Sequence, residues 1–300
     1  MIDYRSARAA LFVRKTGSFE KAARALNVTP SAVSQQVKQL ELRMGVALIV
    51  RGDPCFATEK GETLFRHLEN IGILENELGA QLPELFDPAA VTEPVTIAIG
   101  ADPEILGSWM LEAIASFTQT SGYLVNMVAP DDVQGIELLR SGQAVAAITS
   151  GDEVIEGHRA TPIGWLHWIA VASPDYAKRH FPIGVTIEAI STAPALTLSE
   201  SRHLTSEWVR FALGQEVPFL AHKIPSSNAI LEAASRGMGW SVNPIHTARE
   251  HLKSGELIEL VPGIKLITPL QWQVRGFAVP ALEPLTDSVL KLAKRDLVAE

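Results

Sequence analysis

The chain contains little cysteine and no concentrated set of metal ligands. Cys55 is its single cysteine, and the eight histidines are scattered from His67 to His251. One cysteine forms neither an internal disulfide nor a two-cysteine redox pair, and scattered histidines lack the short spacing of zinc ligands. We therefore expect no disulfide, no metal and no cofactor.

Long hydrophobic runs and catalytic motifs are lacking as well. No apolar run approaches the roughly 18 residues that a membrane span needs, and the start, MIDYRSARAALFVRK, has no signal-peptide pattern. No G-x-S-x-G, P-loop, H-E-x-x-H or reactive Cys–His pair is present, although a triad assembled only in space leaves no such trace. These absences argue against a membrane protein and an enzyme, and they favour a cytoplasmic location.

Positive charge is concentrated at one end of the chain. The net charge is -8, yet residues 1–66 carry 11 Lys and Arg against 6 Asp and Glu, while residues 67–300 carry 15 against 28. The chain is thus a basic head on an acidic body. A basic segment suits a polyanion such as nucleic acid, although so small an excess of positive charge is common on other surfaces.

Two short helices are predicted within this head, over about residues 19–38. Ser18 is a candidate N-cap for the segment SFEKAARAL, which ends in a short turn at Asn27. Thr29 can cap the second helix, and Pro30 fits its first position, where no intrahelical hydrogen bond is lost. A helix, a three-residue turn and a second helix is the spacing of a helix-turn-helix.

The second of these helices has two faces. At about 100° per residue, its apolar side chains fall on one side: Val33, Val37, Leu40 and Met44. Short polar side chains and one lysine fall nearly opposite, and such side chains can bond base edges or phosphates in a major groove. The alternative is an ordinary amphipathic hairpin with a solvated face. The residues expected to contact DNA are Ser31, Ser34, Gln35 and Lys38.

Residues 3–61 resemble the winged helix-turn-helix of LysR-type transcriptional regulators. The match rests on FEKAARALNVTPSAVSQQVKQLE followed by MGVALIVR and TEKG. It implies a DNA-binding domain over residues 1–60, in which the second helix reads operator DNA, Val46 to Thr58 form a wing, and Arg51 contacts the DNA backbone. The stretch GDPCFA departs from the usual wing, which leaves contacts beyond Arg51 open.

A long helix is predicted over residues 58–86, with Thr58 as its cap and Pro83 near its end. Apolar residues recur every seven positions along it, as in a seam between two helices, although Glu75 interrupts the second row. The alternative is a core helix of one subunit. The resemblance implies a linker helix that pairs copies of the chain into a homodimer or homotetramer. The expected seam residues are Leu64, Leu68, Ile71, Leu78 and Leu82.

The remainder of the chain has the pattern of an α/β domain. After a proline-rich hinge at residues 87–94, strand-like segments alternate with helical ones: VTIAIG, LVNMVAP, AVAAITSG and LHWIAVAS are predicted strands. The resemblance implies a periplasmic-binding-protein-like effector domain over residues 95–300. Its first subdomain would span about 95–164 and 268–300, and its second about 165–267, with a small molecule held between them.

Three segments of this domain resemble the lysine- and arginine-responsive, ArgP/LysG-like branch of the family: KRHFPIGVT, PSSNAILEAASRG and KSGELIELVPG. The resemblance implies that the effector is a basic amino acid and that the protein controls its export or metabolism. Such an effector needs hydrogen-bond donors for its carboxylate and acidic residues for its cations. Ligands of open α/β sheets lie beyond the carboxyl ends of the strands.

The candidate effector contacts follow from that chemistry. The helix start after Pro225 offers free amides to a carboxylate, and acidic residues lie near three predicted strand ends. Each has an ordinary alternative, because the same residue types cap helices or stand as solvated charges in a first turn. The candidate effector-binding residues are Asp102, Asp131, Asp132, Asp152, Ser226, Ser227 and Asn228.

The parts together predict a transcriptional regulator. Its expected partners are double-stranded operator DNA, a small-molecule effector and a second copy of the chain, with RNA polymerase as a further candidate. One alternative is a regulator of the same family that responds to a different metabolite. The other is a small-molecule binding protein without a role on DNA, which would account for residues 95–300 but not for the basic head.

Overall fold

The computed structural model describes residues 2–85, 94–101, 105, 109–129, 135–198 and 203–297. The chain divides into two compact units, Met1–Thr96 and Ile97–Glu300, which are treated separately below. In the part of the chain that the structure describes, no helix combines the length and the apolar character that crossing a membrane requires.

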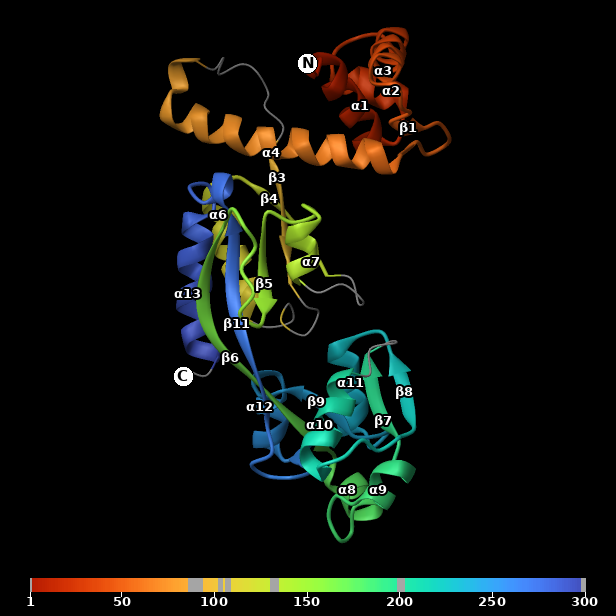
Figure 1. Cartoon of the computed structure of the whole chain (residues 1–300), viewed down its shortest axis with the longest axis vertical. Helices are drawn as coiled ribbons and strands as arrows, with labels where there is room; N and C mark the ends of the chain where they lie inside the picture. The colour runs from red at the N-terminus through yellow and green to blue at the C-terminus, as the bar shows by residue number, and fades with distance from the viewer. Residues whose placement is uncertain are drawn as a thin grey trace. The chain divides into compact units, whose positions relative to one another are not determined.

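The N-terminal unit consists of short helices, a two-stranded wing and one long helix (Figure 1). In chain order its elements are α1 (Tyr4–Thr16), α2 (Phe19–Ala25), α3 (Pro30–Met44), β1 (Ile49–Val50), β2 (Phe56–Ala57), α4 (Glu59–Gln81) and η1 (Pro83–Leu85). The two strands pair antiparallel, with Ile49 opposite Ala57. The winged helix-turn-helix and the long helix expected from the sequence are therefore present.

Local capping determines where these helices begin. The hydroxyls of Ser18, Thr29 and Thr58 each accept a hydrogen bond from the backbone N–H three residues further on. Pro30 occupies the first turn of α3, as predicted. Because each cap satisfies an N–H that the helix itself leaves unpaired, the three helix starts follow from the sequence alone.

One core fills the N-terminal unit. It is built from side chains of α1, α2, α3, the wing and the first turns of α4, among them Phe12, Val33, Val37, Leu40, Leu48, Leu64 and Phe65. Met44 was expected on the same buried side of α3, and that expectation is wrong, since its side chain is 40% exposed. It lies in the last turn of α3, one turn beyond Leu40, the last buried side chain of that helix.

Figure 1 shows the elements of the C-terminal unit in two groups, which are called lobes here. The first lobe contains β3 (Thr96–Gly100), α6 (Leu111–Ser121), β4 (Leu124–Val128), α7 (Gly135–Arg140), β5 (Ala146–Ser150), η3 (Gly276–Ala278) and α13 (Glu283–Asp296). The second lobe contains α8 (Pro174–His180), α9 (Ile187–Thr192), β7 (Ala195–Leu198), α10 (His203–Leu213), β8 (Ala221–Ile224), α11 (Ser227–Ser235), β9 (Ser241–Pro244), α12 (Ile245–Ser254) and β10 (Ile258–Glu259).

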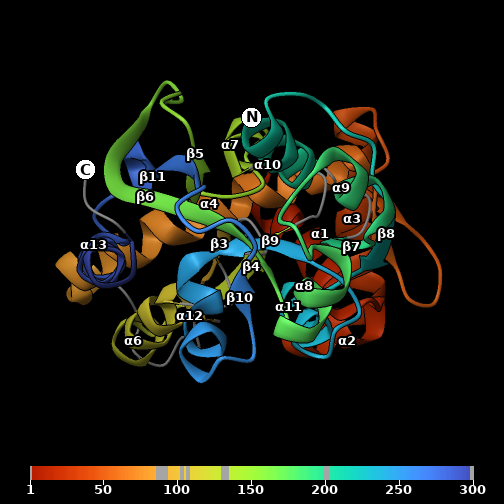
Figure 2. The same cartoon turned by 90° about the horizontal axis from the view of Figure 1, so that it is seen from below.

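Two long antiparallel strands connect the lobes. They are β6 (His158–Ala172) and β11 (Leu266–Arg275). Figure 1 shows them passing from one lobe into the other, and Figure 2 shows the same cartoon from below. Their pairing shifts register between Leu270 and Gln271, where Leu270 lies opposite Gly164. Gly164 has a φ of 121°, a conformation that side chains other than glycine rarely adopt. The irregularity thus lies where the strands cross from lobe to lobe.

The sheet of the C-terminal unit is mixed. Its strand order is β10-β6-β11-β5-β3-β4, with β9 also paired to β6. β3 and β5 are parallel, whereas β11 runs antiparallel to both β5 and β6. β7 and β8 form a separate parallel pair in the second lobe. The predicted α/β architecture is confirmed, but β6 begins at His158 rather than at Leu166, because its proline- and glycine-containing first half pairs with β11.

Candidate DNA-reading surface and effector site

The outer face of α3 carries the residues that the sequence assigns to DNA. Ser31, Gln35 and Lys38 are exposed, and Ser34 is half-buried. The opposite face of the helix is buried against α1 and α2, so α3 cannot turn this outer face inward. The Ser31 hydroxyl lies 3.0 Å from that of Thr29. Among the described residues, the side chains of Gln35 and Lys38 have neither a hydrogen bond nor an ion pair, which leaves both available to a ligand.

The positive charges of the N-terminal unit fall into two groups. The Arg14 guanidinium donates to carboxylates of Glu62, at 3.0 Å, and Glu69, at 3.3 Å, so its charge is offset within the fold. Burial raises the pKa of Glu69, and the nearby Arg14 only partly opposes that effect. Lys38 and Arg51 have no such carboxylate partner in the described structure. The free charge of the basic head therefore includes two of the side chains predicted to meet DNA.

Arg51 lies in the wing, directly after β1. Its guanidinium is placed over the ring of Phe19, with 5.3 Å between the Cζ atom and the ring centroid. The unusual wing stretch that follows turns back onto the protein, because the backbone N–H of Cys55 donates to the carbonyl of Gly17 at 2.8 Å. Cys55 itself is buried in the core of the unit.

The apolar residues of α4 divide between its two ends. Leu64 is only 6% exposed within the unit's own core, and Leu68 packs against that core. Leu64 is therefore covered by its own unit, and its assignment to a seam with a second helix stays a prediction. Further along, Ile71 is half-buried, while Leu78 and Leu82 are exposed, Leu78 by 43%. Together with the exposed Leu74, these side chains form an apolar surface on the C-terminal half of α4.

The candidate effector residues are distributed over both lobes. Asp102, Asp131 and Asp132 lie outside the described residues. Asp152 is exposed and follows β5, at the carboxyl end of that strand. Ser226 to Asn228 follow β8, where the Ser226 hydroxyl caps α11 by accepting from the N–H of Ala229. The acidic candidate thus belongs to the first lobe and the carboxylate-binding candidates to the second.

The start of α11 has one polar atom without a partner. The Ser227 hydroxyl oxygen is shielded from solvent and has no hydrogen bond within the described structure. Asn228 beside it is exposed. A buried hydroxyl without a partner is energetically unfavourable unless a ligand or water satisfies it. Together with the free amides of a helix N-terminus, it provides donors suited to a carboxylate.

Two buried glutamines that the sequence did not single out hold the loop around Asp152. The Gln273 amide is fully buried, donating to the Thr149 hydroxyl at 2.9 Å and the Glu153 carbonyl at 2.7 Å, and accepting from a third group, the N–H of Ile155. Gln271 donates to the carbonyl of Gly151 at 3.0 Å. Asp152 stands between two of the anchored residues, so its backbone is fixed. Alternation in LQWQVR places both glutamines on one strand face, but it does not reveal that this face is covered.

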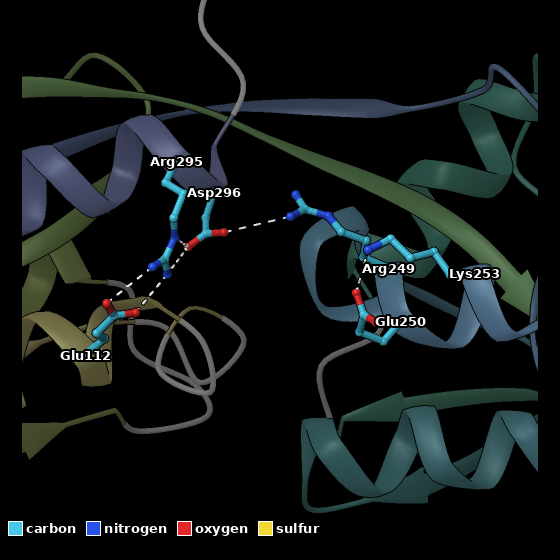
Figure 3. A network of polar contacts seen from close by, with 6 residues as sticks. All are labelled: Glu112, Arg249, Glu250, Lys253, Arg295 and Asp296. Carbon is cyan, nitrogen blue, oxygen red and sulfur yellow. Dashed lines mark hydrogen bonds and ion pairs between the residues drawn. The ribbon is translucent and has the colours of Figure 1, made fainter.

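Charged side chains of the helices α6, α12 and α13 form a network that reaches from one lobe to the other (Figure 3). The Arg295 guanidinium donates to both carboxylate oxygens of Glu112, at 3.2 and 2.8 Å, and to Asp296 at 2.7 Å. Across the lobes, Arg249 of α12 approaches Asp296 of α13 at 3.9 Å. The pair at the lobe boundary is therefore long, whereas the pairs within the first lobe are short.

One small pocket lies elsewhere in the first lobe. It is formed between α13, β6 and β11, has a volume of about 90 Å³, and is lined by residues that include Arg159, Trp272 and Asp287. Binding sites for small molecules usually enclose about 300–1,000 Å³. This pocket is too small for an amino acid, and none of the candidate effector residues that the structure describes lines it.

Comparison with known proteins covers both units. Residues 4–62 match the family model described as bacterial regulatory helix-turn-helix protein, lysR family, and residues 93–292 match the LysR substrate binding domain. The HTH-type transcriptional regulator ArgP of Pseudomonas aeruginosa is 32% identical over 298 residues, covering 99% of this chain and 98% of that one.

Two solved structures are similar over the whole length. ArgP from Mycobacterium tuberculosis is 30% identical, with a TM-score of 0.80 and all of both chains covered. Full-length LysG from Corynebacterium glutamicum with bound effector Arg is 28% identical, with a TM-score of 0.62 and 98% of both chains covered.

Proposed function

The chain belongs to the LysR family of bacterial transcriptional regulators, and on that premise we propose that the signal it senses is a basic amino acid, lysine or arginine. The observation that carries the proposal is the full-length similarity to LysG, a relative whose structure holds arginine as effector. The similarity to ArgP over nearly the whole chain supports the same assignment. The regulated process would then be the export or metabolism of that amino acid.

The proposed DNA contacts divide by chemistry. Ser31, Ser34 and Gln35 are assigned to base edges of double-stranded operator DNA, because their hydroxyl and amide groups both donate and accept. Lys38 is assigned to phosphate or guanine and Arg51 to the DNA backbone, since both carry a charge that no carboxylate of the described structure offsets. Because operator DNA lies in the cytoplasm, the protein is proposed to act there, with RNA polymerase as a candidate partner.

Pairing of two copies is proposed to use the C-terminal half of α4. Ile71, Leu74, Leu78 and Leu82 present an apolar surface there that nothing in the described structure explains as core. A regulator that reads two half-sites must hold its recognition helices about 34 Å apart, which two paired linker helices can do. The proposed assembly is a homodimer or a homotetramer.

The proposed effector site combines groups from the two lobes. The N-terminus of α11, with the unpartnered hydroxyl of Ser227 and the neighbouring Ser226 and Asn228, is assigned to the carboxylate. Asp152 is assigned to a cation of the effector, together with Asp102, Asp131 and Asp132 from the sequence. An effector bound by both lobes favours one arrangement of the lobes over another, and such unequal binding is what regulation requires.

Calorimetry on the full-length protein tests the effector assignment. L-lysine and L-arginine are titrated beside norleucine and citrulline, which keep the backbone groups but replace the charged side-chain end by a neutral one. We expect only the basic amino acids to bind. At a hundredfold excess over Kd, they should raise the free energy of unfolding by about 2.7 kcal/mol and change operator affinity.

Variants then locate the cation contact. Asp152→Asn should cost the basic effectors about 1.5–3 kcal/mol of binding free energy, the range for a hydrogen bond to a charged group. Asp175→Asn is the matched control, an exposed aspartate in the second lobe. If another metabolite binds and neither basic amino acid does at millimolar concentration, the effector assignment is wrong. The alternative, a LysR-family regulator of a different metabolite, is then correct.

A further inference from the structure

The contact between Arg51 and Phe19 joins the wing to the helix-turn-helix. Phe19 is the first residue of α2, is half-buried and packs against the core of the N-terminal unit. Arg51 is exposed on the wing, and its guanidinium lies over the Phe19 ring at 5.3 Å. The structure describes no hydrogen bond or ion pair of Arg51. The ring is fixed by the core, so it is the ring that constrains the arginine.

A ring contact leaves an arginine able to bind an anion. The N–H donors of a guanidinium point outward in its plane, so a ring over its face does not occupy them. An ion pair does occupy them: Arg14, bonded to Glu62 and Glu69, has both its charge and its donors engaged. Arg51 therefore combines a restrained position with donors free for the fork-like pairing that phosphate favours.

The wing around Arg51 is attached to the same turn. The backbone N–H of Cys55 donates to Gly17, and a Cβ added at Gly17 would lie 2.9 Å from the Cβ of Pro54. Gly17 and Phe19 flank Ser18, the cap of α2, and α2 in turn packs on α3. The loop that carries Arg51 is thus supported by the residues that start the helix-turn-helix.

We propose that Phe19 is a positioning residue for DNA binding, whose ring holds the Arg51 guanidinium ready for a backbone phosphate beside the groove that α3 enters. The proposal rests on the proposed contact of Arg51 with DNA. It adds that Phe19 acts through Arg51 and not through the fold alone. A long side chain that is already restrained loses less conformational freedom when it binds.

A double-mutant cycle on the full-length protein tests the proposal. The variants are Phe19→Leu, which keeps apolar bulk without a ring face, Phe19→Tyr, which keeps the ring, Arg51→Gln, and Phe19→Leu with Arg51→Gln. The probe is a duplex selected by the wild-type protein from a random library, with an unrelated duplex beside it. Fluorescence anisotropy gives Kd between 50 and 200 mM salt, a range in which phosphate contacts change affinity strongly.

The expected pattern is specific. Arg51→Gln should weaken binding to both duplexes and reduce the steepness of log K against log salt by about 0.9 for each subunit that contacts the DNA, as expected when every such subunit loses one phosphate contact. Phe19→Leu should weaken binding about two- to fivefold, the fold-change that corresponds to an exposed cation–π contact. It should have no further effect when Arg51 is already glutamine, and Phe19→Tyr should bind like the wild type.

Two results would overturn the proposal. If Phe19→Leu weakens binding equally in the presence and absence of Arg51, Phe19 supports only the fold, because a general loosening does not depend on Arg51. If Phe19→Leu leaves Kd and the salt dependence unchanged, the ring contact has no role. Arg51→Gln separates this from the proposed function: no effect there removes Arg51 from the interface and leaves the assignment of α3 to be tested by its own variants.

Discussion

The two units differ in the burial of polar side chains: Gln35 and Lys38 are exposed in the N-terminal unit, and Gln273 is buried in the C-terminal unit. In the N-terminal unit, Gln35 and Lys38 lie outside a completed apolar core, and substituting them removes no core contact. In the C-terminal unit, Gln273 is fully buried and joined to Thr149 and to the loop around Asp152. The residues proposed to read DNA can therefore be replaced without removing a core contact of the first unit, whereas replacing Gln273 in the second unit removes a buried side chain that also holds the loop around Asp152.

The largest loss of function is expected from substitutions in the apolar surface of α4. They test whether exposed residues of the first unit can be replaced while the unit stays folded. Replacing Ile71 and Leu78 by Glu would place charges in a two-helix interface, so pairing and operator binding should both be lost while the unit stays folded. Sedimentation velocity and anisotropy measure the two effects.

Ala80→Glu is the matched control, because this exposed residue of α4 lies about half a turn away from Ile71 and Leu78. It should leave pairing intact. A double variant that still pairs through α4 and binds operator DNA at full strength would remove the seam from this region.

The next largest effect is a loss of stability on replacing the buried Gln273 of the C-terminal unit. Gln273→Leu removes an amide and leaves the Thr149 hydroxyl, the Glu153 carbonyl and the Ile155 N–H without their partner. Each unpaired buried group costs about 1–3 kcal/mol, so the C-terminal unit should lose at least one such increment of stability. Denaturant unfolding measures it.

Gln143→Leu is the control, since Gln143 is exposed in the same lobe. It should be close to neutral. Equal stability of the Gln273 variant and the wild type would show that the loop around Asp152 does not depend on this amide, and the contrast between the units would disappear.

A smaller effect, on operator binding and not on stability, is expected from the exposed face of α3. Gln35→Ala should cost roughly 1–3 kcal/mol for one operator and relax base choice, because an amide bonded to a base edge carries sequence information. Lys38→Ala should weaken many sequences alike. Both variants should unfold at the temperature of the wild type, and unchanged affinity and selectivity in both would place this face outside the interface.

The smallest effect is a pH dependence in the second unit. Burial lowers the pKa of His246; the Asp296 carboxylate raises it and the Arg249 guanidinium lowers it further, leaving the direction downward. The unfolded chain, with a histidine pKa of about 6.5, then binds more protons than the folded one at pH values between the two pKa values. The neutral His246 contributes stability in full above pH 6.5, and this contribution is lost as the pH falls through the folded pKa.

Denaturant unfolding at several pH values between 7.5 and 5.0 checks this dependence. His246→Gln should flatten the decline in the free energy of unfolding, though only partly, because burial also lowers the pKa of His158 and His167. His222→Gln, at an exposed site on β8, is the control. The same decline in the His246 variant and the wild type would contradict the prediction.

Structural features that depend only on residues close together in the sequence could be predicted from the sequence. The hydroxyls of Ser18, Thr29 and Thr58 each bond an N–H three residues on, so the sequence is enough to locate them as caps. The periodicity of α3 separates Val33 and Val37, which are buried, from Gln35, which is exposed. Such features need no knowledge of the rest of the chain.

The heptad pattern of α4 was ambiguous for a physical reason. Leu64 and Leu78 occupy equivalent positions of the repeat, yet Leu64 is buried in its own unit and Leu78 is exposed. A row of apolar side chains records that something packs against the helix, and it does not record whether the partner is the same chain or another. Three of the acidic effector candidates, Asp102, Asp131 and Asp132, lie outside the described residues, so their assignment stays a prediction.

By itself, the sequence determined the helix starts, the two faces of α3, the α/β character of the second unit and the resemblance to a regulator family, since each depends on spacing within a short segment. Only the tertiary structure decided that Phe19 lies under Arg51 and that Gln273 reaches Thr149 across 124 positions of the chain. Contacts between such distant residues depend on how whole strands and helices pack. That packing does not produce a periodic pattern in the sequence, so the sequence alone does not predict these contacts.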